Sequence, residues 1–122
     1  MTEDSKTETY DGVLFGILAL EFPGDDPAGS QRKIKRKLGR LGLGAYEQER
    51  VDYVRNLKND LQNEIGLSVE SNYYLRSFAA TADPRDFDYD RLVVDFRRKY
   101  PKISKADMRT IVTFAISAYY LR

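Results

Sequence analysis

The clearest hydrophobic pattern lies between residues 45 and 65, where apolar side chains recur at three- and four-residue spacing. The residues that define the period are Val54, Leu57, Leu61 and Ile65. This spacing places them on one face of an α-helix. Acidic residues occupy the first turn, and Gly66 follows the last periodic residue, as is typical of a helix start and a helix C-cap. The pattern predicts an amphipathic helix over this segment.

Two further helices are predicted on either side of Pro101. Asp83 followed by Pro84 is typical of an N-cap and a first helical position. The apolar stripe of the helix that they begin comprises Leu92, Val93, Phe96 and Tyr100. Ser104 and Asp107 resemble a capping box, which predicts a last helix running to the terminus. Its inward face is expected to comprise Met108, Ile111, Val112, Ala115 and Tyr119.

The N-terminal part of the chain is less regular. Residues 10–22 are nearly all apolar, and we expect them to be buried as a helix, with a β-strand as the alternative for so short a run. Gly12 and Gly16, four residues apart, suit close helix packing. Residues 23–27 are rich in Pro, Gly and Asp, so they are expected to end this segment as a loop.

These segments predict an all-α protein, because none shows the strict alternation of a half-buried strand. The expected architecture is a four-helix bundle with an extra short helix, which Ser68 or Ser71 would cap. The inner face of this short helix is expected to carry Tyr74, Leu75 and Phe78. We expect a flexible acidic tail at residues 1–9 and a single helical domain at residues 10–122. Residues 31–44 form the basic, glycine-containing connecting segment of that domain.

The composition excludes several classes of chemistry. The chain of 122 residues has no Cys and no His, which removes disulfides, cysteine nucleophiles, imidazole-based triads and the usual zinc sites. The remaining proton-transfer groups are carboxylates and nine tyrosines. A catalytic carboxylate pair needs a deep cleft, which a thin helical bundle seldom provides. We therefore expect no catalysis, no cofactor and no metal.

No segment is expected to span a membrane. The longest apolar stretch, residues 13–20, has eight residues, whereas a spanning helix needs about 20. The first residues are acidic rather than basic, unlike a secretory signal. Prior removal of a targeting peptide would leave the same sequence, so the compartment stays open.

The net charge of +1 hides strongly charged blocks. Residues 1–30 sum to −6 and residues 31–44 to +6, whereas residues 45–90 sum to −5 and residues 91–122 to +6. We expect the two basic blocks to dock on a larger protein complex by charge. The first contact patch is predicted to comprise Arg32, Lys33, Lys35, Arg36, Lys37 and Arg40. The second is predicted to comprise Arg97, Arg98, Lys99 and Lys102.

The first basic block has two interpretations. Ile34 and Leu38, four residues apart, suit a short basic amphipathic helix that lies against phosphates, an anionic membrane or an acidic protein. The alternative is a solvated loop whose charge offsets that of the acidic N-terminal residues. No aromatic residue interleaves the bases, which disfavours a stacking platform for single-stranded nucleic acid.

Two other motifs have ordinary structural explanations. Three aspartates alternate like the first ligands of a calcium-binding loop: Asp86, Asp88 and Asp90. Arg91 and Arg97 stand where an EF-hand needs Gly and Glu, so we expect a helix start instead. The glycines within residues 39–44 lack the spacing of a phosphate-binding loop and indicate a hinge or loop.

A DNA-binding regulator is the alternative function. In this interpretation the last two helices form a helix-turn-helix joined by the short turn at residues 101–103. The exposed stripe of the recognition helix would comprise Lys105, Arg109, Thr113 and Ser117. The second basic patch would then contact backbone phosphates.

Several short runs resemble a family of small photosystem II proteins. The runs are Tyr53-Val54-Arg55, Phe96-Arg97-Arg98-Lys99, Met108-Arg109-Thr110 and Ala118-Tyr119-Tyr120. These extrinsic and assembly proteins dock on the lumenal side of the complex as four-helix bundles. The resemblance covers residues 45–122, and it implies a cofactor-free, non-catalytic subunit of the thylakoid lumen whose partners are photosystem II core subunits. Residues 31–44 have no counterpart in this family. If the resemblance is set aside, a cytoplasmic location is expected.

Overall fold

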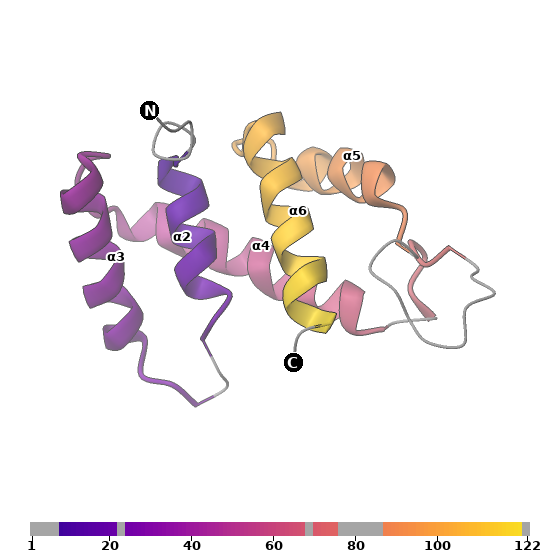
Figure 1. Ribbon diagram of the computed structural model, residues 1–122, viewed down its shortest axis with the longest axis horizontal. Helices are drawn as coiled ribbons and strands as arrows, with labels where there is room; N and C mark the ends of the chain where they lie inside the picture. Colours follow the sequence, from indigo (N-terminus) through magenta and orange to yellow (C-terminus); the bar gives the residue numbers. More distant parts are fainter. Residues whose placement is uncertain (1–7, 22–23, 68–69, 76–86, 121–122) are drawn as a thin grey trace. The chain divides into compact units, whose positions relative to one another are not determined.

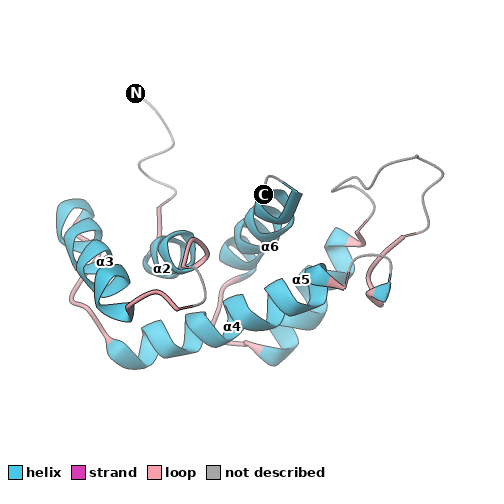
Figure 2. Ribbon diagram, turned by 90° about the horizontal axis from the view of Figure 1, so that it is seen from below, coloured by secondary structure: helices cyan, strands magenta, loops and turns pink. Residues whose placement is uncertain are grey.

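The computed structural model describes residues 8–21, 24–67, 70–75 and 87–120, and the regular elements in these ranges are helices (Figures 1 and 2). They are α2 (Tyr10–Leu18), α3 (Pro27–Leu41), α4 (Gln48–Gly66), α5 (Tyr89–Lys99) and α6 (Lys105–Tyr120). The predicted all-α class is confirmed, and the number of helices is that of a four-helix bundle with one additional helix. The chain divides into two compact units at residues 56 and 57, within α4. Each unit is described by itself.

Helix α2 confirms the helical alternative for the apolar N-terminal segment, although it ends at Leu18. The side chain of Thr9 caps it by accepting a hydrogen bond of 3.1 Å from the backbone N–H of Gly12. Gly16 does not serve close helix packing, because a Cβ built there meets nothing within 4 Å. The buried side chains of α2 are Tyr10, Asp11, Val13, Leu14, Phe15 and Leu18.

Helix α3 begins inside the segment that was expected to be a loop and covers most of the predicted connecting segment. Asp26 is its N-cap, with Oδ1 accepting a 3.0 Å hydrogen bond from the N–H of Ala28, and Pro27 is its first residue. The helix ends at Gly42, whose φ of 64° is left-handed. Residues 31–41 of the basic connecting segment are therefore helical, and residues 42–47 connect α3 to α4.

Unit 1 contains α2, α3 and the start of α4, and two arginines of α4 bind one acid within α2 and one that follows it. The Nε of Arg50 donates to the Oδ1 of buried Asp11 at 3.1 Å, and its guanidinium lies 4.4 Å from the ring centroid of Tyr10. Arg55 binds Glu21 through two parallel hydrogen bonds of 3.2 and 2.8 Å. These partners are 34 to 39 residues apart in the sequence. The ion pairs thus fix α4 relative to α2 within unit 1.

Unit 2 buries most of the apolar stripes predicted for the other helices, although Tyr100 is only half-buried. Met108 is fully buried, and Ile103 in the turn before α6 is 1% exposed. Ser104 caps α6 as expected, because its Oγ accepts a 3.0 Å hydrogen bond from the N–H of Asp107. The side chain of Tyr119 lies outside the described residues. The helical side chains buried in this unit include Leu57, Leu61, Ile65, Leu92, Val93, Phe96, Ile111, Val112 and Ala115.

Residues 71–75, where the short helix capped by Ser68 or Ser71 was expected, form a bend, a turn and a bridge, and Glu70 before them has a 3₁₀ conformation. Buried Ser71 donates to the carboxylate of Glu64, and Tyr74 instead forms an isolated antiparallel bridge with Phe87. Helix α5 then begins at Tyr89, five residues after the predicted start, with Asp88 as its N-cap. The predicted positions of Ser68, Phe78, Asp83 and Pro84 lie outside the described residues.

Candidate docking surfaces

The six bases predicted as the first contact patch all lie on α3, which carries no acidic residue. Ile34 and Leu38 face the core of unit 1 and are at most 1% exposed. The bases occupy the rest of the helix surface, and all are exposed except Lys37, which is half-buried. The structure therefore decides between the two interpretations of this block. It is a basic amphipathic helix, not a solvated loop.

Four of these bases line an open hollow of about 310 Å³. They follow one another at the i, i+3, i+4 and i+7 positions of α3, and the half-buried Ile17 of α2 completes the lining. We call this hollow the cationic groove; its lining residues are Ile17, Lys33, Arg36, Lys37 and Arg40. The sequence identified the four bases but gave no reason to associate Ile17 with them, because α2 and α3 meet only in the folded unit.

Among the described residues, few of the α3 cations have partners. The Nζ of Lys37 lies 3.7 Å from the Oε1 of Glu8, and both side chains are about one-third exposed. Lys35 lies 5.3 Å from the ring centroid of Tyr46. In the described ranges, no carboxylate lies within ion-pair distance of the remaining four bases, Arg32, Lys33, Arg36 and Arg40.

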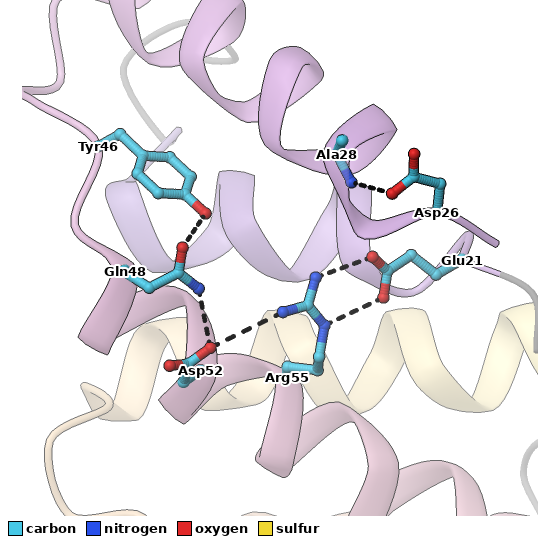
Figure 3. Close-up of polar contacts among 7 residues, drawn as sticks. All are labelled: Glu21, Asp26, Ala28, Tyr46, Gln48, Asp52 and Arg55. Atoms are coloured by element: carbon cyan, nitrogen blue, oxygen red, sulfur yellow. Dashed lines mark hydrogen bonds and ion pairs between the residues drawn. The ribbon is translucent and has the colours of Figure 1, made fainter. Parts of the chain in front are cut away.

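A chain of hydrogen bonds holds the residues that follow α3 (Figure 3). The Tyr46 hydroxyl donates to the side-chain oxygen of Gln48, whose amide donates to Asp52, both at 2.9 Å. Asp52 in turn lies 3.8 Å from Arg55, which binds Glu21. Burial raises the pKa of Tyr46. Each acid in this network is paired with a polar or basic group of unit 1 outside α3, so the network supports the fold.

The second predicted patch is largely bound within unit 2. The Nε of Arg97 donates to the carbonyl oxygen of Ile103 at 3.3 Å, across the turn between α5 and α6. Arg98 lies 3.6 Å from Asp95, and Lys99 lies 3.7 Å from Asp60. Lys102 is exposed but also has an interaction within the protein. These contacts lie at the C-terminal end of α5 and in the turn after it, so fewer of these charges are available to a partner.

The predicted recognition stripe on α6 is exposed as expected, but its surroundings are partly aromatic. A second hollow of about 450 Å³ is lined by Tyr89, Arg109, Thr110, Thr113, Phe114 and Ser117. Phe114 is 38% exposed. The Thr113 hydroxyl donates at 2.8 Å to the carbonyl oxygen of Arg109 in its own helix, so this donor is not available to a base edge. Sequence reasoning missed Tyr89 and Phe114, because neither belongs to a basic motif.

The motifs considered for calcium and phosphate have structural roles where they are described. Asp88 caps α5 and Asp90 lies in its first turn, which confirms the helix-start interpretation for these two residues. Asp86 lies outside the described residues. The part of the chain that the structure describes contains no group of three or more acidic residues that could hold a metal ion. Within the same part, no helix is long and apolar enough to cross a membrane.

Comparison with protein-family models, curated proteins and solved structures gave no match to this chain. The resemblance to the photosystem II proteins therefore stays a prediction.

Proposed function

We propose that this protein is a non-catalytic accessory subunit that docks on an acidic surface of a larger protein complex through α3. The observation that carries the proposal is the set of exposed α3 cations without a carboxylate partner among the described residues. Like charges at positions i and i+4 destabilise a helix by about 0.2–0.5 kcal/mol per pair. An acidic partner relieves this repulsion, so the arrangement that weakens the free helix favours docking.

The environment of α3 supports a protein partner over a membrane or single-stranded nucleic acid. Ile34 and Leu38 are buried in unit 1, so no apolar face of α3 remains to enter a lipid interface. The helix contains no aromatic residue on which bases stack. Charge pairing with carboxylates is the interaction that its exposed side chains offer most directly.

We propose a smaller contribution from the second basic patch. Arg97, Arg98 and Lys99 each make an intramolecular polar contact. A partner that recruits them competes with these contacts. The resemblance to the photosystem II proteins names one assembly on whose lumenal side such a subunit would dock, but the proposal requires only an acidic protein surface.

Copurification of the tagged chain from its native source tests the proposal. The partner should be retained at about 0.1 M salt and released at about 1 M, where the Debye length falls from about 10 to about 3 Å. The double variant Arg36→Gln/Arg40→Gln should lose the partner. Its matched control is Lys105→Gln/Arg109→Gln, which removes the same charge from two exposed positions on α6.

Two outcomes would overturn the proposal. The first is a partner that Arg36→Gln/Arg40→Gln retains as well as the unaltered chain does. The second concerns the DNA-binding alternative and uses a gel shift with random duplex DNA at low salt. Micromolar binding that is lost in Lys105→Gln/Arg109→Gln and kept in Arg36→Gln/Arg40→Gln would favour a DNA-binding regulator instead.

A further inference from the structure

The cationic groove has a defined repeat along α3. Lys33 lies one turn before Arg36 and Lys37, and Arg40 lies one turn after them. An α-helix advances about 5.4 Å per turn, so positive charges recur along the groove at about this interval. Ile17 of α2 places a half-buried apolar side chain beside them. The groove thus combines a regular row of cations with one apolar contact.

We infer that the cationic groove binds an acidic amphipathic helix of the partner protein. Carboxylates on successive turns of that helix pair with the bases of α3, and an apolar residue on the same face contacts Ile17. This inference rests on the proposed function and specifies the partner segment that the groove accepts.

The spacing of the cations favours a helical partner over an extended one. Carboxylates on successive turns of a helix also recur at about 5.4 Å, so they stay opposite the α3 cations over the two turns from Lys33 to Arg40. Side chains on one face of an extended strand recur at about 6.7 Å. They would fall out of register by more than 1 Å at each step. A helix therefore matches the repeat of the groove more closely than an extended strand does.

Glu8 shows that a carboxylate fits at the edge of the groove. Its Oε1 lies 3.7 Å from the Nζ of Lys37, and both side chains are about one-third exposed. The carboxylate of a partner therefore competes with Glu8 for Lys37. Replacing Glu8 with Gln should strengthen binding of an acidic helix about twofold, because it frees this cation without altering the groove.

Binding of synthetic peptides to the full chain tests the inference. The probe is a capped, alanine-based peptide of about 18 residues, long enough to be helical in water. It carries Glu on successive turns of one face and a Leu among them. The control peptide has the same composition with the Glu residues distributed around the helix. Fluorescence anisotropy at low salt should show binding of the patterned peptide about tenfold tighter than that of the control peptide.

Variants of the chain separate the two parts of the groove. Arg36→Gln/Arg40→Gln should weaken binding of the patterned peptide about tenfold or more, and Ile17→Ala should weaken it about threefold. Lys105→Gln/Arg109→Gln should bind the peptide as the unaltered chain does. Circular dichroism establishes that each variant keeps its helical content, so a loss of binding is not a loss of folding.

The outcomes distinguish this inference from the proposed function. Equal affinity for the two peptides, with both weakened by Arg36→Gln/Arg40→Gln, overturns the acidic helix and leaves electrostatic docking intact. Tighter binding of duplex DNA or of anionic phospholipid vesicles than of the patterned peptide also overturns it. Failure of both peptides to bind, together with unchanged copurification of Arg36→Gln/Arg40→Gln, overturns the inference and the proposed function.

Discussion

Residues 31–44 and residues 91–122 each carry a net charge of +6, but the structure uses the two blocks differently. On α5, Arg98 and Lys99 lie near Asp95 and Asp60, and Arg97 binds a backbone carbonyl. On α3, the described residues provide Lys37 with an acidic partner in Glu8. The comparison teaches that equal charge in the sequence does not mean equal charge available to a partner.

The positions of the bases within each helix add to this difference. Arg97, Arg98 and Lys99 all lie in the last turn of α5, where cations interact favourably with the helix dipole. On α3 only Arg40 lies in the last turn. Most α3 cations therefore stabilise neither their own helix nor an ion pair. A role in binding explains them better than a role in stability.

The largest effect is expected on partner binding, and it tests whether the two basic blocks differ in the charge that they offer to a partner. Arg36→Gln/Arg40→Gln should weaken partner binding at least tenfold, or about 1.4 kcal/mol. The same variant should keep its stability to urea, because the loss of like-charge repulsion at i and i+4 offsets the loss of Arg40 from the last turn of α3. Arg98→Gln/Lys99→Gln should weaken partner binding less than Arg36→Gln/Arg40→Gln does, and it should lower the free energy of unfolding. Equal losses of binding in the two variants would contradict the comparison.

The next effect is expected on stability, and it concerns the hydrogen bonds and ion pairs that hold the basic residues at the end of α5. The hydroxyl of Tyr100 donates to Asp60, which also lies 3.7 Å from Lys99. Tyr100→Phe removes this donor and should lower the free energy of unfolding by about 1 kcal/mol. Urea unfolding followed by circular dichroism measures the change. Unchanged stability would mean that the charges at the end of α5 are less engaged than the structure indicates.

A smaller change separates the shape of α3 from its charge. Gly39 lies within the last turns of α3, and a Cβ at that position meets nothing within 4 Å. Gly39→Ala should raise the free energy of unfolding by about 0.5 kcal/mol, because alanine has the higher helix propensity. Its binding to the partner should equal that of the unaltered chain, since no charge changes. Weaker binding would show that docking depends on close approach to the backbone at this position.

The smallest effect expected is in the pH dependence of the two units. Burial raises the pKa of Tyr10 in unit 1 and that of Tyr73 in unit 2, and the Tyr73 hydroxyl also donates to Asp95 at 2.8 Å. When folding raises the pKa of a tyrosine, the neutral hydroxyl stabilises the folded state. This stabilisation is complete below about pH 10 and is lost as the pH rises through the pKa of the tyrosine in the folded state. Unfolding should therefore become easier above pH 10, and less so in Tyr73→Phe. Titration of phenolate absorbance should show one late-ionising tyrosine fewer in this variant.

The sequence predicted those parts of the fold that depend on local patterns. The stripe from Val54 to Ile65 and the Ser104 cap were sufficient for α4 and for the start of α6. Asp26 and Pro27 carry the same N-cap and proline signal that was used at Asp83 and Pro84. At Asp26 this signal lies within residues 23–27, whose content of Pro, Gly and Asp favours a loop. The sequence thus underestimated α3, whose Ile34 and Leu38 suffice to anchor it in unit 1.

The sequence by itself determined that the chain is helical and which residues carry the positive charge, because both follow from residue type and from neighbours within a few turns. Only the tertiary structure decided which cations of the described residues pair with acids distant in the sequence. Asp60 and Tyr100 are 40 residues apart in the chain, yet they are hydrogen-bonded beside Lys99. Ion pairing depends on the distance between charges in space, and for residues so far apart in sequence folding alone sets that distance.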